Sequence, residues 1–204
     1  MKLVCLDLEG VLVPEIWIAF SKKTGIEELK LTTRDIPDYN VLMKKRLGIL
    51  DEHGLKLPDI QDVISGIDPL EGALEFLNEL RENYQVVILS DTFEEFARPL
   101  MKKLGWPTLF CNSLVVDGDG RITDFCLRQQ DGKRKAVEAF HSAGMTITAA
   151  GDSYNDISMI KKADHGVLFM PPDNIVAEFP ELPVARDYMT LLSEIKKSFS
   201  GNEC

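Results

Sequence analysis

Short apolar runs alternate with segments of helical spacing over most of this chain. Glu71–Tyr84 carries apolar residues at helical intervals, and the apolar run Gln85–Leu89 follows it directly. Beyond it we expect helices at Glu94–Leu104, Lys133–Ala143, Tyr154–Ala163 and Asp187–Ser198, and strands at Leu109–Val116, Arg121–Leu127, Thr146–Ala150 and Gly166–Phe169. Such alternation is typical of βαβ units. The sequence therefore predicts an α/β fold, with a parallel sheet and helices on both faces.

The first strand is separated from the rest of this pattern by a helical block. Lys2–Leu8 is an apolar run that stops at Glu9-Gly10, and no convincing strand follows before Ile67. The expected helices of the block are Glu15–Lys23, Tyr39–His53 and Leu57–Ser65. Gly and Pro residues punctuate the block between these helices, as they do at helix boundaries. We expect residues 14–70 to form a small inserted helical subdomain, and residues 1–13 and 71–204 to form the sheet domain.

The charge balance limits the classes of partner. Lys and Arg number 23 against 33 Asp and Glu, a formal net charge of −10. Nucleic acids and anionic membranes favour basic proteins, so neither is expected as a partner, whereas a small phosphorylated ligand needs only one or two local cations. No apolar run approaches the roughly 20 residues of a membrane span, no CxxC pair is present, and we expect no signal peptide. The expectation is a cytoplasmic protein, either a monomer or a homodimer.

Polar residues gather where the predicted strands end. They are Asp7, Glu9, Ser90, Asp91, Asp152, Asn155 and Asp156, with Lys133 at the start of a helix that returns to the same edge. Ligands of open parallel sheets bind beyond the carboxyl ends of the strands. So many carboxylates cannot all ionise together in a cleft without a cation, and oxygen donors suit a hard divalent ion. The sequence therefore predicts a Mg²⁺ site that also holds a phosphate.

Four segments in this order resemble the motifs of the haloacid dehalogenase superfamily of phosphatases. They are Asp7-Leu8-Glu9-Gly10-Val11, Ser90 after Val86–Leu89, Lys133, and Gly151-Asp152-Ser153-Tyr154-Asn155-Asp156. The resemblance implies a Rossmann-like core in which Asp7 is the nucleophile that forms an aspartyl-phosphate and Glu9 is the general acid and base. It further implies that Ser90 and Lys133 hold the phosphoryl group. Asp7, Glu9 and Asp152 would bind Mg²⁺, and Asp156 would support that site, for example by holding Lys133.

The position of the helical block narrows the resemblance. It lies between the first and second motifs, like the helical cap of the phosphoserine phosphatase branch. That likeness implies that Glu15 and Arg46 bind the amino and carboxylate groups of the substrate, with Asp91 and Asn155 as further contacts. Glu9 in place of Asp, and Ser90-Asp91-Thr92 in place of Ser-Gly-Gly, resemble a bacterial subgroup that also transfers phosphate to homoserine, in serine and threonine biosynthesis.

Several of these residues have plainer explanations. Lys133 stands beside Arg134 and Lys135, and Arg46 beside Lys44 and Lys45, so either cluster could be a solvated basic surface. Ser90 could cap the helix after it, and Glu15 could be a charge in a first helical turn. The segment Asp117-Gly118-Asp119-Gly120 lacks the later ligands of a calcium loop, which favours a hairpin turn.

The expected function is that of a Mg²⁺-dependent phosphoserine phosphatase, with possible transfer of the phosphoryl group to homoserine. One alternative is a phosphatase of another small phosphomonoester. The other is a regulatory protein that binds phosphate without turnover, although the pair Asp7 and Glu9 argues against it.

Overall fold

Seven strands form one sheet in the order β4-β3-β2-β1-β5-β6-β7 in the computed structural model, which describes residues 1–32, 35–36 and 38–200. The strands are β1 (Lys2–Leu6), β2 (Gln85–Phe93), β3 (Thr108–Val116), β4 (Ile122–Cys126), β5 (Thr146–Gly151), β6 (His165–Phe169) and β7 (Val184–Ala185). Every neighbouring pair is parallel except β3 and β4, which are antiparallel. The predicted parallel α/β sheet is confirmed.

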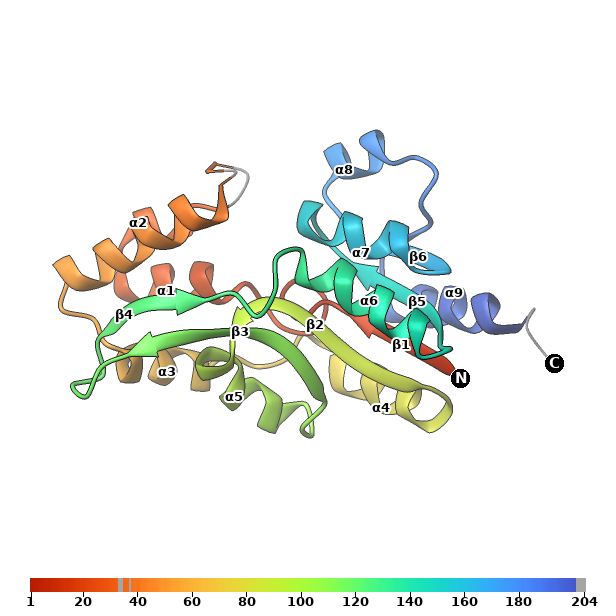
Figure 1. The fold of residues 1–204 in the computed structure, drawn as a ribbon, viewed down its shortest axis with the longest axis horizontal. Helices are drawn as coiled ribbons and strands as arrows, with labels where there is room; N and C mark the ends of the chain where they lie inside the picture. Colours follow the sequence, from red (N-terminus) through yellow and green to blue (C-terminus); the bar gives the residue numbers. More distant parts are fainter. Residues whose placement is uncertain (33–34, 37, 201–204) are drawn as a thin grey trace.

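Helices cover both faces of the sheet (Figure 1). The α-helices are α1 (Ile16–Thr24), α2 (Tyr39–Glu52), α3 (Leu57–Ser65), α4 (Ala73–Asn83), α5 (Glu94–Lys103), α6 (Gly132–Ser142), α7 (Ile157–Lys162), α8 (Asp173–Glu178) and α9 (Tyr188–Ser200), and the 3₁₀ helices are η1 (Glu27–Lys30) and η2 (Tyr154–Asp156). None of the helices in the described ranges combines the length and apolar character that a bilayer crossing needs.

Strand β1 lies at the centre and contributes to both hydrophobic layers. Val4 and Leu6 pack with α4, α5 and α9, whereas Leu3 and Cys5 pack with α6 and α7. Successive side chains of a strand point to opposite faces, so a strand covered on both sides is continuously apolar. Its central position fixes the residue that follows it, Asp7, in the middle of the sheet's carboxyl edge.

The helical block lies beside the β3–β4 hairpin (Figure 1). The backbone N–H of Leu57 donates to the carbonyl of Gly120 at 2.9 Å, and Arg121 pairs with Asp51 of α2 at 2.7 Å. The Asp117–Gly120 segment is the tight turn of this hairpin, because Asp117 Oδ1 accepts the N–H groups of Asp119 and Arg121. The hairpin and the helical block therefore form one packed unit over the sheet edge.

Strand β2 continues beyond the point at which the sequence predicted its end. We expected the strand to stop at Leu89, but it extends to Phe93, with a shift of register against β3 between Leu89 and Phe93. An irregularity of this kind bends a strand and re-aims its side chains. It places Ser90 and Asp91 at the sheet edge. Since α5 begins only at Glu94, Ser90 does not cap that helix.

Three short elements, η1, α8 and β7, were not predicted, and the expected helix at Tyr154–Ala163 is divided into η2 and α7. Elements of two to six residues are too short for a periodic pattern to show in the sequence.

Candidate active site

Asp7 stands at the carboxyl end of β1 and is 4% exposed. Its N–H donates to the carbonyl of Ala150 at 3.0 Å, which continues the pairing of β1 with β5. Its Oδ1 atom accepts the N–H of Leu8 at 2.7 Å and lies 2.9 Å from Lys133 Nζ. Within the described ranges no hydrogen bond engages Oδ2, so this oxygen is available to a ligand.

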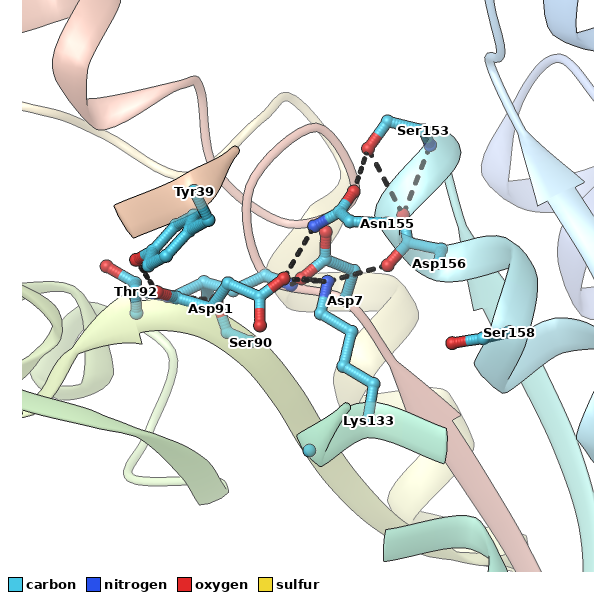
Figure 2. A network of polar contacts seen from close by, with 12 residues as sticks. Asp7, Tyr39, Ser90, Asp91, Thr92, Lys133, Ser153, Asn155, Asp156 and Ser158 are labelled. Carbon is cyan, nitrogen blue, oxygen red and sulfur yellow. Dashed lines mark hydrogen bonds and ion pairs between the residues drawn. The ribbon is translucent and has the colours of Figure 1, made fainter. Parts of the chain in front are cut away.

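Lys133 is buried among carboxylates (Figure 2). Its ammonium group lies 2.6 Å from Asp156 Oδ1, 2.9 Å from Asp7 Oδ1 and 3.8 Å from Asp91 Oδ2. Burial alone would lower the pKa of Lys133, but Asp156 and Asp7 outweigh it and raise that pKa well above its usual value. Lys133 is therefore a permanent cation at the centre of the site.

The next two basic residues in the sequence, Arg134 and Lys135, do not form ion pairs with Asp7 among the described residues. Arg134 pairs with Asp131 and with Glu138, the second at 2.6 Å, and Lys135 is only half-buried. Of the three basic residues that the sequence offered here, only Lys133 is brought to Asp7.

Asp7, Asp152 and Asp156 form one acidic cluster, in which one oxygen from each lies within 4.8 Å of the others. Burial first, and then Asp156, raises the pKa of Asp7 well above its usual range, although Lys133 opposes this. Burial, Asp156 and Glu15 raise the pKa of Asp152 to about 7. These shifts mean that one lysine does not neutralise the cluster. Three carboxylates in this arrangement suit a hard divalent cation.

Two glycines allow the carboxylates to lie this close to the backbone. A Cβ at Gly10, whose φ is +76°, would overlap the carboxylate of Asp152. A Cβ at Gly151 would overlap Asp156. The second carboxylate is fixed further, because Asp156 Oδ2 accepts the N–H groups of Asp152 at 3.0 Å and Ser153 at 3.1 Å.

Glu9 lies outside the acidic cluster. Its Oε2 atom accepts the N–H of Ile16 at 2.8 Å, at the start of α1. Burial and the nearby carboxylate of Glu15 raise the pKa of Glu9 to about 8, against the lowering effect of the Ile16 N–H. A carboxyl group with this pKa can both give and take a proton near neutral pH.

A cavity of about 340 Å³ connects these groups with the helical block. Its walls include Asp7, Glu9, Glu15, Trp17, Tyr39, Arg46, Ser90, Asp91, Asp152 and Asn155. Every predicted site residue except Lys133 and Asp156 lines it. Lys133 contacts Asp7, and Asp156 accepts the backbone N–H of Asp152.

Arg46 projects from α2 into this cavity and is 7% exposed, whereas Lys44 and Lys45 are exposed to solvent. Its guanidinium lies 4.5 Å from the centre of the Trp17 ring, and its Nη2 donates to the carbonyl of Leu31 at 2.8 Å. Burial lowers the pKa of Arg46 to about 10, so the group stays cationic at neutral pH. Its buried Nε has no hydrogen-bond partner among the described residues, which leaves a donor for an anionic ligand.

Ser90, Asp91 and Asn155 form the side of the cavity nearest to η2. Ser90 Oγ accepts the N–H of Thr92 at 3.2 Å, which leaves its own hydrogen available to donate. Asn155 Nδ2 donates to Asp91 Oδ2 at 2.8 Å, and Asn155 Oδ1 accepts from Ser153 Oγ (Figure 2). The Asn155 amide is thus held at both ends.

Tyr39 and Trp17 also line the cavity, and neither was predicted as a site residue from the sequence. Tyr39 precedes Arg46 by seven residues, or two helical turns, so both residues share a face of α2. The spacing from Arg46 is therefore the sequence signal that identifies Tyr39.

A family model of haloacid dehalogenase-like hydrolases matches residues 1–164. The chain belongs to this family. It is 60% identical to the phosphoserine phosphatase of Pseudomonas syringae pv. tomato, over 98% of this chain and 82% of that protein. It is 59% identical to the phosphoserine phosphatase ThrH of Pseudomonas aeruginosa, over 98% of each chain.

Solved structures give the same picture of the fold. A crystal structure of an apo phosphoserine phosphatase is similar with a TM-score of 0.77 and 28% identity, over 94% of this chain and 98% of the other. The predicted membership of the superfamily and the predicted Rossmann-like α/β fold are confirmed.

Proposed function

We propose that this protein is a Mg²⁺-dependent phosphoserine phosphatase that also transfers the phosphoryl group to homoserine. The observation that carries this proposal is the Asp7 carboxylate, held at one oxygen by buried Lys133, beside a cavity that Glu9 and Arg46 also line. The two Pseudomonas relatives that are named phosphoserine phosphatase support the substrate. The name ThrH of the second relative accords with the threonine biosynthesis that the sequence resemblance implies.

In the first chemical step Asp7 Oδ2 attacks phosphorus and the bond from phosphorus to the serine oxygen breaks. Glu9 gives its proton to that oxygen, since its pKa of about 8 keeps the carboxyl protonated at neutral pH. Lys133 and Ser90 hold the phosphoryl oxygens. A solved structure described as a phospho-aspartyl intermediate analogue of phosphoserine phosphatase, with a TM-score of 0.75 and 27% identity, supports the aspartyl-phosphate.

In the second step the oxygen of water or of homoserine attacks phosphorus. The bond between Asp7 and phosphorus breaks, and the acceptor proton passes to the Glu9 carboxylate. Both acceptors need the same proton transfer, so one site serves both reactions.

The cation would be held by Asp7 and Asp152. Asp156 lies in the same cluster, but both of its oxygens already accept hydrogen bonds, so its role is to hold Lys133 and the backbone of Asp152. Glu9 was also predicted as a metal ligand, and that contact stays a prediction; its Oε2 atom accepts the N–H of Ile16, and we assign the carboxyl group to proton transfer. A bound Mg²⁺ would mask the negative charge of the phosphoryl group and so make it accessible to a carboxylate nucleophile.

The amino-acid end of the substrate would lie against the helical block, in which residues 14–70 act as a cap. The Arg46 guanidinium suits a carboxylate, and the Glu15 carboxylate suits an ammonium group. Asp91 and Asn155 complete this part of the wall. A volume of about 340 Å³ is at the small end for ligand cavities and fits a single amino-acid phosphate.

A cytoplasmic location is part of the same proposal. Cys5, Cys111 and Cys126 are free thiols, which suits a reducing compartment.

The test is ³¹P NMR of the purified protein with L-phosphoserine, Mg²⁺ and excess homoserine. We expect the phosphoserine signal to be replaced by inorganic phosphate and phosphohomoserine, and the Asp7→Asn variant to form neither. Inorganic phosphate alone would refute the transferase part. Unchanged phosphoserine, with turnover of another phosphomonoester, would refute the substrate while leaving the chemistry intact.

A further inference from the structure

A second cavity, of about 840 Å³, adjoins the candidate active site. It extends over residues 127–133 and reaches Tyr154, Ser158 and Asn174. The two cavities share four wall residues, namely Tyr39, Ser90, Asp91 and Asn155. These four residues therefore form the boundary between the two cavities, and the larger cavity also reaches Lys133 beside Asp7.

This wall is held together at Asp91. The main-chain carbonyl of Asp91 accepts the hydroxyl of Tyr39 and the amide of Asn112, each at 3.0 Å. The carboxylate of Asp91 accepts the amide of Asn155 at 2.8 Å (Figure 2). Tyr39 comes from the helical block, whereas Asp91, Asn112 and Asn155 come from the sheet domain.

The hydrogen bond of Tyr39 to Asp91 forms only when the helical block is closed on the sheet domain. It begins α2, the helix that also carries Arg46, and its ring packs edge-on against Phe125 of β4 with ring centres 6.0 Å apart. A movement of α2 away from the sheet edge would break the bond from the Tyr39 hydroxyl to Asp91. The same movement would withdraw Arg46 from the cavity.

The wall matters because the two acceptors of the aspartyl-phosphate differ in abundance. With either acceptor, the Asp7–phosphorus bond breaks, a new phosphorus–oxygen bond forms, and the acceptor proton passes to Glu9. A chamber of about 840 Å³ has room for many water molecules, at about 30 Å³ each in the liquid. An alcohol can compete only if this water is kept away and the alcohol is well oriented.

We propose that the Tyr39 hydroxyl, through its bond to the Asp91 carbonyl, is the determinant that favours an alcohol over water as acceptor. This inference rests on the proposed function. Tyr39 acts as a specificity-determining residue of the wall, and it makes no bond to the reacting phosphorus.

The test compares Tyr39→Phe with the wild type. Phenylalanine keeps the ring against Phe125 and removes only the hydroxyl. Each protein is incubated with Mg²⁺, L-phosphoserine and ¹³C-labelled L-serine. Label entering phosphoserine measures capture of the intermediate by an alcohol, and inorganic phosphate measures capture by water. Labelled serine is the leaving group itself, so the assay does not depend on homoserine being accepted, and homoserine is then run as a second acceptor.

The readout is the ratio of alcohol capture to water capture. Because both products come from one intermediate, a smaller folded fraction lowers both and leaves their ratio unchanged. We expect the ratio to fall about threefold to tenfold in Tyr39→Phe, the effect of one hydrogen bond.

The matched control is Tyr188→Phe. The Tyr188 hydroxyl also donates to a backbone carbonyl, that of Val11 at 2.6 Å, but Tyr188 lines neither cavity. We expect its ratio to equal that of the wild type. An unchanged ratio in Tyr39→Phe, or an equal fall in Tyr188→Phe, would overturn the inference. A wild type that releases no phosphate from phosphoserine would instead refute the proposed function on which it rests.

Discussion

Replacing Lys133 by methionine should destabilise the protein strongly, because it leaves buried carboxylates without their cation. Lys133 is 4% exposed and lies 2.9 Å from Asp7 and 2.6 Å from Asp156. Removing one partner of a buried ion pair costs about 3–5 kcal/mol. For a chain of this length, that loss corresponds to a fall in Tm of about 6–20 °C.

The loss of stability in Lys133→Met should depend on pH in a definite direction. The pKa of Asp7 is already raised in the folded protein. Asp7 therefore lowers the free energy of unfolding as the pH rises above the ordinary pKa of an aspartate. Lys133 opposes that rise, and its removal raises the pKa of Asp7 further. The deficit of Lys133→Met should therefore be greatest at about pH 8, shrink toward about pH 5 as the carboxylates become protonated, and shrink when Mg²⁺ is added.

The assay is urea unfolding followed by far-UV circular dichroism, in EDTA and in Mg²⁺, at both pH values. The control is Lys135→Met, two residues further along α6, where the lysine is half-buried and has no ion pair among the described residues. We expect the control to lie within about 0.5 kcal/mol of the wild type. Equal stabilities for the two variants at pH 8, or a deficit that grows toward pH 5, would refute the reasoning.

Four further predictions concern the site. Asp7→Asn should lower the turnover of phosphoserine at least about 1,000-fold in a steady-state assay, since it removes the nucleophile, and a surviving rate would contradict the mechanism. Loss of the Glu9 proton should make kcat/KM decline above about pH 8, and in Glu9→Gln the residual rate should lack this decline. Gly10→Ala should displace Asp152 and weaken Mg²⁺ binding, measured by calorimetry, while an unchanged affinity would exclude Asp152 as a ligand. Arg46→Lys should raise KM about 10- to 100-fold with a smaller change in kcat, because an ammonium group lacks the guanidinium fork.

The sequence predicted the central strands of the sheet better than the ends of strands and the short elements. Residues 3–6 are buried on both faces, and a strand covered in this way is apolar throughout, so composition alone identifies it. The predicted end of β2 was wrong because Ser90 and Asp91 are polar and lie in the irregular stretch between Leu89 and Phe93, after which the pairing with β3 resumes. Elements as short as α8 and β7 depend on neighbours that a local pattern does not include.

Site residues that follow adjacent strands within a motif could be predicted from the sequence. Residues whose side-chain direction depends on packing were hard to predict. Asp7 and Asp152 follow strands that lie side by side, so their proximity follows from topology. The choice of Lys133 over Arg134 depends on which side chain helix α6 turns toward Asp7, and burial decides it. The contact of the Tyr39 hydroxyl with the Asp91 carbonyl joins residues 52 positions apart, so the sequence around Tyr39 does not predict this partner.

The charge of the cluster indicates the order in which the site must fill. When fully ionised, the carboxylates of Asp7, Asp152 and Asp156 outweigh Lys133 by two charges. A phosphate monoester is also largely a dianion near neutral pH, so the site without a cation repels it. A divalent cation cancels this excess and removes the repulsion. Burial first, and then the same repulsion by Asp156, raises the pKa values of Asp7 and Asp152. Phosphate-ester affinity and stability should therefore rise together as Mg²⁺ is added, because one electrostatic imbalance limits both.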